Sequence, residues 1–412
     1  MTPAEPSLEV LLARVDAAGE ALRARSRASV ARSLGQAVEL IREAELPLGH
    51  QAREVLPTAT GLSLPMVAWA LAEVCRSADA EALARLADLY DGRPDREAVP
   101  ARRSVIVLAG NVFTAGLTPI LHSLLSLAPT VVKASSREDL FPRVVQAAIA
   151  EVDPELGDAL AVVSFPGGSE ALERAIFGGA DVVHAYGSDR TLCAIRGRLP
   201  ATTRFVGHGH GLGVLVVPKA ALGSRDEART VAEAASYDIA AYDQRGCLSP
   251  HAAIVEEGGA VDGAAFAQLL SDALGERASD LPRGPLPTQV GAAQIQWRGI
   301  AAVRGTLHEG DGWAVAHEGG ERPRIGPGWR NVQVVDADGL EHAVELVRGF
   351  GVHLKAVGVA GPRSVRRRLR AALAPTLAPR VCPVGEVQRP PLLALADGAC
   401  LSEAFVRWVE VE

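Results

Sequence analysis

The sequence predicts an α/β fold with two domains, and three observations lead to this prediction. The chain has 412 residues, which is enough for two or more domains of ordinary size. Its hydrophobic share of 48% and charged share of 22% are typical of a globular protein with a sizeable core. From Ser104 onward, short apolar runs alternate with helical segments. Apolar strands that are each followed by a helix are typical of a parallel sheet covered on both faces.

The first hundred residues are predicted to be helical, because their apolar residues recur at steps of three and four positions. This pattern covers Leu8–Ala24, Ala28–Ala44, Leu64–Val74 and Ala80–Tyr90. A first series of strands and helices follows, in the outline of a doubly wound sheet that binds a dinucleotide. Its predicted strands are Ser104–Leu108, Thr130–Lys133, Ala159–Phe165, Asp181–Tyr186 and Thr202–Val206.

A second α/β series begins near Gly213 and continues into the last third of the chain. Two segments within it are predicted to be loops, Ser279–Pro287 because it is rich in Pro and Gly, and Gly305–Trp329 because of its Gly, His and Trp residues. We therefore expect a first domain over residues 1–212 that contains the helical region and the dinucleotide-binding sheet. Residues 213–385 are expected to form a second α/β domain, and residues 386–412 to return to the first.

Charge and cysteine content exclude several classes of protein. The net charge of −7 argues against a nucleic-acid or anionic-membrane partner. No apolar stretch reaches membrane-spanning length without a charge, Gly or Pro, and residues 1–12 lack the features of a signal peptide. The five cysteines are widely spaced and odd in number, unlike a disulfide framework or a zinc site. We expect a cytoplasmic protein with no membrane span and no metal.

The most informative segment runs from Tyr242 to Val255 and contains Cys247. This cysteine follows a glycine and precedes a β-rich run, so we expect it in a turn where its thiol faces a cleft. A thiolate suits nucleophilic attack on an acyl carbonyl and can hold the acyl group as a thioester. The alternative is a buried, unreactive cysteine.

Two further polar segments follow predicted strands of the first domain. Asn111 lies between a strand and a helix, where a side-chain amide can donate to an oxyanion or simply cap the helix. Lys133, with Ser135 two residues later, lies at a strand's carboxyl end, where open α/β sheets bind cofactors. The alternative for Lys133 is an exposed charge without a ligand.

A turn and a late segment complete the candidate set. Gly187 and Ser188 open a predicted helix, whose N-terminus can hold a phosphate, although such pairs usually only start a helix. Glu386 lies in a Pro-rich stretch that by itself predicts only a surface turn. Each of these signals is weak alone, and their order along the chain adds to their weight.

Together these segments resemble the LuxC-type acyl-CoA reductases of the aldehyde dehydrogenase superfamily. Gln244–Pro250 matches their Gln-x-Gly-Cys-Leu-Ser-Pro-like loop nearly residue for residue, and the resemblance runs from Ser104 to Gln388. It implies an aldehyde dehydrogenase-like fold, with a Rossmann-type cofactor domain and a second α/β catalytic domain. The implied roles are nucleophile for Cys247, oxyanion donor for Asn111, adenosine-ribose contacts for Lys133 and Ser135, pyrophosphate contacts for Gly187 and Ser188, and nicotinamide-ribose contact for Glu386.

One departure from the hydrolytic aldehyde dehydrogenases bears on the reaction. Those enzymes carry a Glu that activates water before the cysteine, whereas residues 205–211 here contain His208 and His210 and no carboxylate. The resemblance therefore implies NADPH-dependent reduction of an acyl-CoA, or of a carrier-bound acyl thioester, to an aldehyde by a homo-oligomer; NADH is the other cofactor considered. The alternatives are aldehyde oxidation, acyl-phosphate reduction and a catalytically silent binding subunit.

Overall fold

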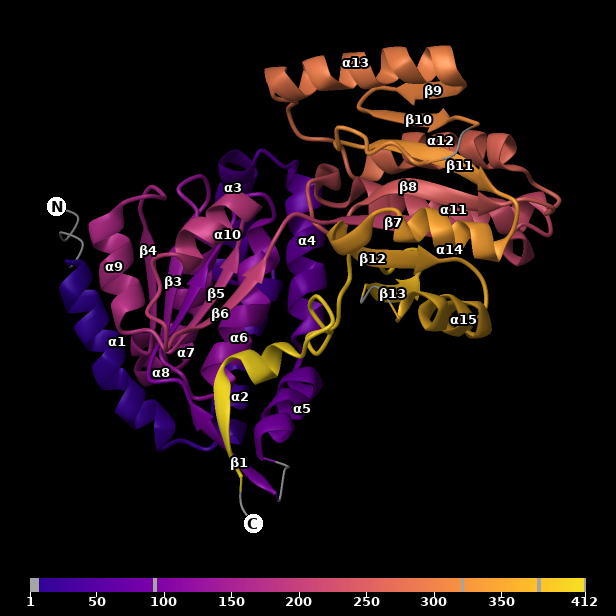
Figure 1. The fold of residues 1–412 in the computed structure, drawn as a ribbon. Helices are drawn as coiled ribbons and strands as arrows, with labels where there is room; N and C mark the ends of the chain where they lie inside the picture. Colours follow the sequence, from indigo (N-terminus) through magenta and orange to yellow (C-terminus); the bar gives the residue numbers. More distant parts are fainter. Residues whose placement is uncertain (1–6, 92–94, 320–321, 376–378, 411–412) are drawn as a thin grey trace. The chain divides into compact units, whose positions relative to one another are not determined.

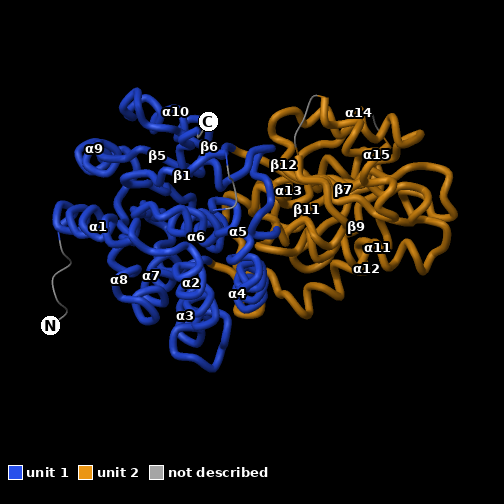
Figure 2. Tube along the Cα trace, turned by 90° about the horizontal axis from the view of Figure 1, so that it is seen from below, with its two compact units in different colours: residues 1–60, 67–209, 391–412 blue, residues 61–66, 210–390 orange. Residues whose placement is uncertain are grey.

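The computed structural model describes residues 7–91, 95–319, 322–375 and 379–410. The chain divides into two compact units, which Figure 2 shows in separate colours. Unit 1 comprises Met1–Thr60, Val67–Gly209 and Pro391–Glu412, and unit 2 comprises Gly61–Met66 and His210–Pro390. Within the described part of the chain, no helix combines the length and apolar character needed to cross a membrane.

Unit 1 is built on a five-stranded parallel sheet of order β4-β3-β2-β5-β6. Its strands are β2 (Ser104–Val107), β3 (Thr130–Ala134), β4 (Leu160–Ser164), β5 (Val182–Tyr186) and β6 (Arg204–His208). The chain starts at the central strand β2, moves outward to β4, and then crosses back past β2 to β5. The strand order therefore reverses between β2 and β5, and open α/β sheets bind ligands at the carboxyl ends of strands at such a point.

Helices cover both faces of this sheet (Figure 1). Apolar side chains of α1 (Leu8–Arg23), α9 (Glu170–Gly178) and α10 (Asp189–Arg196) pack with Val105, Val131 and Val183 on one face. On the other face lie α6 and α7, and α2 packs behind them. The remaining bounds in this unit are α2 (Arg27–Arg42), α3 (Pro47–Thr60), α4 (Leu64–Ser77), α5 (Ala80–Asp91), η1 (Phe113–Gly116), α6 (Leu117–Leu125), α7 (Leu140–Val152) and α8 (Pro154–Asp158).

The C-terminal segment belongs to unit 1. Strand β14 (Val406–Glu410) pairs antiparallel with β1 (Arg96–Pro100), as the yellow strand beside β1 shows in Figure 1. Preceding it, η5 (Leu401–Ala404) packs against α6. The imidazole of His122 lies 2.9 Å from the carbonyl oxygen of Leu392, which ties this segment to the buried side of α6.

Unit 2 contains a seven-stranded sheet of order β13-β12-β7-β8-β11-β10-β9. All pairs are parallel except β10 with β9. The strands are β7 (Leu212–Val217), β8 (Pro250–Glu256), β9 (Thr306–Gly310), β10 (Trp313–His317), β11 (Asn331–Ala337), β12 (Leu354–Val359) and β13 (Arg380–Pro383).

The two faces of this sheet carry separate apolar cores. Helices α11 (Arg225–Ala240) and α12 (Gly263–Asp280) pack on one face, where alanines of α11 allow close approach. Helices α14 (Leu340–Arg348) and α15 (Arg363–Leu373) pack on the other. Helix α13 (Thr288–Arg304) covers β9 and β10. Three short turns complete the unit, namely η2 (Lys219–Ala221), η3 (Ala241–Gln244) and η4 (Gly351–His353).

One predicted loop is wrong. Residues 305–329 were expected to be irregular, but they contain the hairpin β9–β10. The hairpin turns at Asp311-Gly312, where Gly312 has a φ of +88°. An Asp-Gly pair between alternating apolar residues is a hairpin signal, and the Gly and His content of the flanking residues obscured it.

Candidate functional site

Cys247 lies in unit 2, in a turn between η3 and β8. Its side chain is exposed, and none of the five cysteines forms a disulfide. Cys193 on α10 is also exposed, whereas Cys75 and Cys382 are buried and Cys400 is intermediate. Burial raises the pKa of both Cys75 and Cys382 to about 12, which makes those thiols unreactive.

The backbone that leads into this turn is strained. Tyr242, Asp243 and Gln244 have φ angles of +52°, +53° and +59°, in the left-handed region that non-glycine residues rarely adopt. All three side chains are buried. Such strain costs roughly 1–3 kcal/mol per residue and persists only where the surroundings fix it, which is a common feature of functional sites.

Buried polar contacts fix this strained segment to the loop before β11. The carboxylate of Asp243 accepts from Arg330 at 2.7 Å and from the backbone N–H of Gly284 at 3.0 Å. The side-chain amide of Gln244 accepts from the N–H of Asn331 at 2.8 Å and donates to the carbonyls of Asn331 and Pro250, at 3.1 and 2.6 Å. Every oxygen and nitrogen of the Gln244 amide is therefore engaged.

The turn itself is tight, and it requires a glycine, Gly213, on the neighbouring strand β7. The N–H of Gly246 donates to Ser249 Oγ at 3.2 Å, and the N–H of Ser249 donates to the carbonyl of Gly246 at 3.1 Å. Gly213 on β7 lies against the turn, where a Cβ would clash with the carbonyl oxygen of Leu248. A side chain at Gly213 would therefore displace the turn that presents Cys247.

The candidate residues of unit 1 come from one edge of the five-stranded sheet. Asn111 follows β2 and is exposed, Lys133 is the penultimate residue of β3, and Gly187 and Ser188 follow β5. These are carboxyl ends of parallel strands, and β2 and β5 are the neighbours between which the strand order reverses. The structure thus brings the unit 1 candidates to the edge where a dinucleotide is expected.

Lys133 and Ser135 lie in a restricted, electropositive part of this edge. Lys133 is buried, its ammonium lies 5.3 Å from the centre of the Phe165 ring, and desolvation lowers its pKa. Ser135 is half-buried, and its Oγ accepts from the N–H of Arg137. Gly110 packs on it, because a Cβ there would be 2.6 Å from Ser135 Oγ. The nearby Glu138 is buried and caps α7 at Phe141 rather than facing solvent.

Gly187 and Ser188 both form hydrogen bonds with the backbone of neighbouring residues. The N–H of Gly187 donates to the carbonyl of His208 at 3.1 Å, and Ser188 Oγ accepts from the N–H of Thr191 at 3.2 Å as the cap of α10. Asp189 begins this helix, and a carboxylate there disfavours an anion. The helix-start interpretation therefore accounts for the contacts of both residues.

Glu386 lies in unit 2, in an exposed position of a well-fixed turn after β13. Gly385 has a φ of +90°, and the N–H of Glu386 donates to the carbonyl of Pro383 at 3.2 Å. Arg380 donates to the carbonyl of Glu386 at 2.8 Å. The Glu386 carboxylate lies 3.6 Å from the guanidinium of Arg389.

His208 and His210 do not form a pair. His208 ends β6 in unit 1, and its Nδ1 lies 2.7 Å from Asp397, while His210 opens unit 2 and is exposed. The His208 ring packs on the buried His184 at a centroid distance of 4.6 Å. Within the described ranges, no group of three or more His, Cys, Asp or Glu residues could hold a metal ion.

The sequence did not reveal several residues that build the Cys247 turn. These are Arg330 and Gly284, which hold Asp243, and Asp238 and Gln388, which are linked to Ser249. Arg330, Gly284 and Gln388 are distant in sequence from the turn, and Asp238 is linked to Ser249 through the distant Gln388, so no local pattern identifies them. An arginine that is 1% exposed is an unusual burial, but only the fold shows it.

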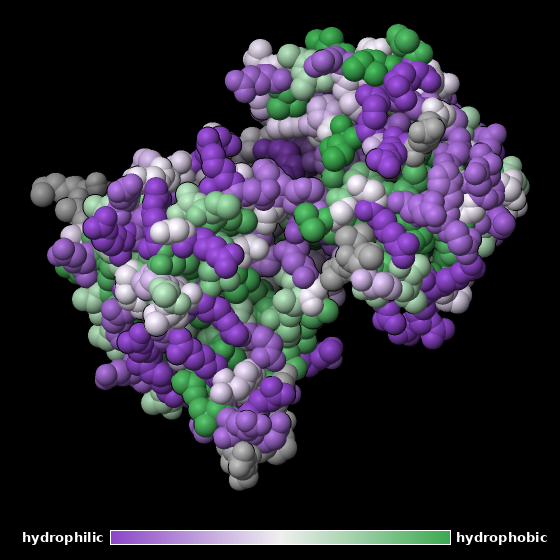
Figure 3. Space-filling model, in the orientation of Figure 1, coloured by the Kyte–Doolittle hydropathy of each residue, from purple (hydrophilic) through white to green (hydrophobic). Residues whose placement is uncertain are grey.

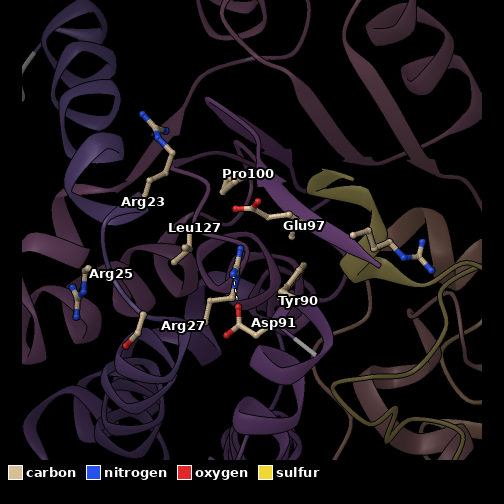
Figure 4. Close-up of a pocket in the computed structure, with 11 residues that line it drawn as sticks. Arg23, Arg25, Arg27, Tyr90, Asp91, Glu97, Pro100 and Leu127 are labelled. Atoms are coloured by element: carbon tan, nitrogen blue, oxygen red, sulfur yellow. Dashed lines mark hydrogen bonds and ion pairs between the residues drawn. The ribbon is translucent and has the colours of Figure 1, made fainter. Parts of the chain in front are cut away.

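A separate open pocket of about 600 Å³ lies in unit 1, and none of the candidate residues lines it. In Figure 4, Arg27 and Asp91 pair at its centre, while Arg23 and Arg25 point away from each other. Arg25 pairs instead with Asp153, at 2.6 Å. The charges of this pocket therefore do not converge on one ligand position.

Solved structures identify the fold class. The chain matches an NAD-dependent benzaldehyde dehydrogenase from Corynebacterium glutamicum with a TM-score of 0.72 and 15% identity, over 98% of this chain and 90% of that one. It matches aldehyde dehydrogenase 21 from Physcomitrella patens with a TM-score of 0.72 and 11% identity, over 98% and 89%. The fold is therefore that of the aldehyde dehydrogenases, as the sequence predicted.

The sequence model of the acyl-CoA reductase (LuxC) family matches residues 50–406, and the chain belongs to this family. A long-chain acyl-protein thioester reductase of Photorhabdus laumondii is 26% identical over 156 residues, and one of Aliivibrio fischeri is 28% identical over 158. Each alignment covers 37% of this chain and 32% of the relative. The matched segment thus spans about a third of the length of these curated relatives.

Proposed function

We propose that the protein is an oxidoreductase that reduces an acyl thioester to an aldehyde through a thioester on Cys247. The observation that carries this proposal is the strained, over-determined turn that presents an exposed Cys247. Buried polar contacts to Asp243 and Gln244 hold the segment that leads into that turn in a costly backbone conformation. The LuxC family and the acyl-protein thioester reductases supply the substrate class.

The proposed chemistry begins with attack of the Cys247 thiolate on the thioester carbonyl. The bond from carbonyl carbon to the donor's sulfur breaks, the donor thiol leaves, and the acyl group stays on Cys247. Asn111 is proposed to donate a hydrogen bond to the carbonyl oxygen as negative charge develops there. Reduction then breaks the bond to Cys247 and restores its thiolate as the aldehyde leaves.

We propose NADPH as the cofactor, which when bound supplies the hydride for that reduction. The carboxyl edge of the five-stranded sheet fits a dinucleotide at the reversal between β2 and β5. Lys133 and Ser135 are proposed to bind the adenosine ribose and its 2′-phosphate, because the nearby carboxylate of Glu138 is buried. Gly187 and Ser188 are proposed to lie at the pyrophosphate, and Glu386 at the nicotinamide ribose.

The acyl donor is proposed to be acyl-CoA or a carrier-bound acyl thioester. Membership of the acyl-CoA reductase (LuxC) family supports the first, and similarity to the long-chain acyl-protein thioester reductases supports the second. A hydrolytic reaction is less consistent with the chain, because His208 is engaged by Asp397 and no carboxylate lies between residues 205 and 211. Product analysis distinguishes the aldehyde from the acid.

The decisive experiment measures the intact mass of the protein after incubation with a panel of acyl-CoAs without cofactor. Wild type should gain the mass of the acyl group and lose it when NADPH is added. Cys247→Ala should show no adduct. Cys193→Ala is the matched control, because Cys193 is also exposed, and it should behave as wild type.

Other outcomes have clear meanings. An adduct that persists in Cys247→Ala would remove the proposed nucleophile. If no acyl-CoA labels wild type, the same assay with acyl-carrier proteins and acyl phosphates tests the other donors, and no adduct from any donor favours the silent-subunit alternative. In the active protein, Asn111→Ala should slow acylation by roughly 10²–10³-fold, the usual cost of losing one oxyanion donor.

We also propose that the protein is a cytoplasmic homo-oligomer that pairs through α13. Ile295 and Val303 on the outer face of this helix are 76% and 88% exposed, and hydrophobic residues gather there in Figure 3. Ile300 on the same helix is also exposed. An uncharged face can pack against the same face of a second copy of the chain that is related to it by a two-fold axis. Val303→Glu should shift the mass measured by light scattering toward the monomer, and an unchanged mass would exclude this face.

A further inference from the structure

The turn that carries Glu386 is anchored by a buried carboxylate that the proposed chemistry does not use. Asp238 lies in the last turn of α11, and it is 1% exposed. Its Oδ2 accepts from the N–H of Gly385 at 2.6 Å, and its Oδ1 accepts from the N–H of Val387 at 2.9 Å. The two donors flank Glu386, so one carboxylate fixes the turn on both sides of it.

The same residue is linked to the turn of Cys247 through Gln388. The side-chain amide of Gln388 donates to the carbonyl of Asp238 at 3.2 Å and to Ser249 Oγ at 3.1 Å. Ser249 Oγ in turn accepts from the N–H of Gly246, the residue before Cys247. A continuous hydrogen-bonded chain therefore runs from the Glu386 turn to the Cys247 turn within unit 2.

Burial and the surrounding hydrogen-bond donors act on the Asp238 carboxyl in opposite directions. Burial raises the pKa of Asp238 to about 7, and the N–H groups of Gly385, Val387 and Gln388 lower it. Arg389 also stabilises the charged form, and Asp238 in turn raises the pKa of the nearby Cys382 thiol. An isolated buried carboxylate is costly, so the converging N–H donors are what make it tolerable at this position.

We propose that Asp238 is a positioning residue that couples the cofactor-binding Glu386 turn to the Cys247 turn through Gln388 and Ser249. This inference rests on the proposed function, which supplies the roles of Glu386 and Cys247. It goes further because the position of the nucleophile and the position of the cofactor-binding turn both depend on one buried residue, through its carboxylate and its backbone carbonyl. A change that displaces Asp238 should therefore impair two steps that are chemically separate.

The test compares Asp238→Asn with Glu318→Gln, a matched loss of a buried carboxylate in the same unit. Glu318 is 1% exposed and pairs with Arg304 at 2.8 Å and with Arg324. Asp238→Asn should raise the KM for NADPH and slow the acylation of Cys247, each roughly tenfold, because small misplacements of reacting groups are costly. Glu318→Gln should lower the unfolding midpoint and leave both quantities within about twofold of wild type.

A second variant keeps the coupling testable if Asp238→Asn fails to fold. Gln388→Met removes the link and leaves both contacts of the Asp238 carboxylate in place. It should slow acylation of Cys247 while changing the KM for NADPH less than twofold. In the double variant, Gln388→Met should add little to the acylation defect of Asp238→Asn. Additive defects would overturn the proposal.

Amide hydrogen exchange measures the coupling between the Glu386 turn and the Cys247 turn without requiring the enzyme reaction. Asp238→Asn should speed exchange at Gly385 and Val387, because one of these two N–H groups loses its acceptor oxygen, and also at Gly246, which is linked to Asp238 through Ser249 and Gln388. Faster exchange at Gly385 and Val387 alone would show a local anchor and overturn the coupling. This result stands even if wild type forms no acyl adduct, which would reject the proposed function separately.

Discussion

Asp243 and Arg330 form an ion pair of 2.7 Å in which both side chains are almost completely buried, at 0% and 1% exposure. The two residues are 87 positions apart, and each has a left-handed backbone, with φ of +53° and +64°. Two strained segments thus hold each other, one before Cys247 and one before β11. Desolvation lowers the pKa of Arg330, which shows what burial of this pair costs.

Removing one partner of this pair should be strongly destabilising. Arg330→Met leaves the Asp243 carboxylate buried without its ion pair, although the hydrogen bond from the N–H of Gly284 remains, so we expect a loss of about 3–5 kcal/mol in unfolding free energy. Chemical denaturation measures it. The control is Arg368→Met, which breaks the exposed pair with Glu341 and should cost less than about 1 kcal/mol. Equal losses of unfolding free energy in the two variants would mean that burial does not determine how much the Asp243–Arg330 pair contributes to stability.

Gln244 offers a test of the Cys247 turn that changes little in size. In Gln244→Glu, two donated hydrogen bonds become contacts between a carboxylate and the carbonyls of Pro250 and Asn331. We expect a loss of about 2–3 kcal/mol in stability and at least tenfold slower acylation of Cys247, since charged groups left unpaired are costly when buried. Gln51→Glu on the exposed face of α3 is the control. Acylation at the wild-type rate in Gln244→Glu would show that the reactivity of Cys247 does not depend on the strained segment before it.

The sequence predicted the α/β class because period-2 and period-3.6 patterns are local. No element was predicted for the residues of α13, because Ile295 and Val303 put large apolar side chains on its outer face and the helix lacks a clean apolar stripe. The β9–β10 hairpin was wrongly predicted as a loop, although Asp311-Gly312 marks its turn.

The candidate residues divide in the same way. Cys247 could be identified because its neighbours, from Gln244 to Pro250, are contiguous in sequence. Arg330 and Asp238 could not, because their contacts with the turn arise only when distant segments fold together. For Ser188 the structure shows the capping bond that sequence reasoning gave as the alternative. Its role toward a phosphate remains a prediction.

Cofactor preference should depend on the charge beside Lys133. Ser135→Asp places a carboxylate two residues from Lys133, where Ser135 is half-buried against Gly110. We expect the KM for NADPH to rise roughly 10–100-fold, because the carboxylate repels a 2′-phosphate, and the KM for NADH to change much less. Steady-state kinetics with both cofactors measure this, with Ser136→Asp as the exposed control. An equal rise for NADH and NADPH would show that position 135 does not contact the 2′-phosphate.

The ion pair of Arg25 and Asp153 should make unit 1 sensitive to acid. The hydrogen bond from Arg25 lowers the pKa of Asp153 to about 2, with Ser33 as a further donor. Because the folded pKa lies below the unfolded value of about 3.9, the stabilisation is present above pH 4 and is lost as pH falls toward 2. A shift of this size corresponds to at most about 2.6 kcal/mol, and partial solvent access reduces it to about 1 kcal/mol.

Asp153→Asn tests the sign directly. The unfolding free energy of wild type should fall by about 1 kcal/mol more than that of the variant between pH 5 and pH 3, as followed by urea denaturation at each pH. Asp158→Asn is the control, because Asp158 pairs with Arg14 at 3.7 Å with both side chains largely exposed. Its pH dependence should match wild type. If Asp153→Asn also follows the wild-type curve, the Arg25 contact contributes nothing to acid stability, and the linkage argument fails for this pair.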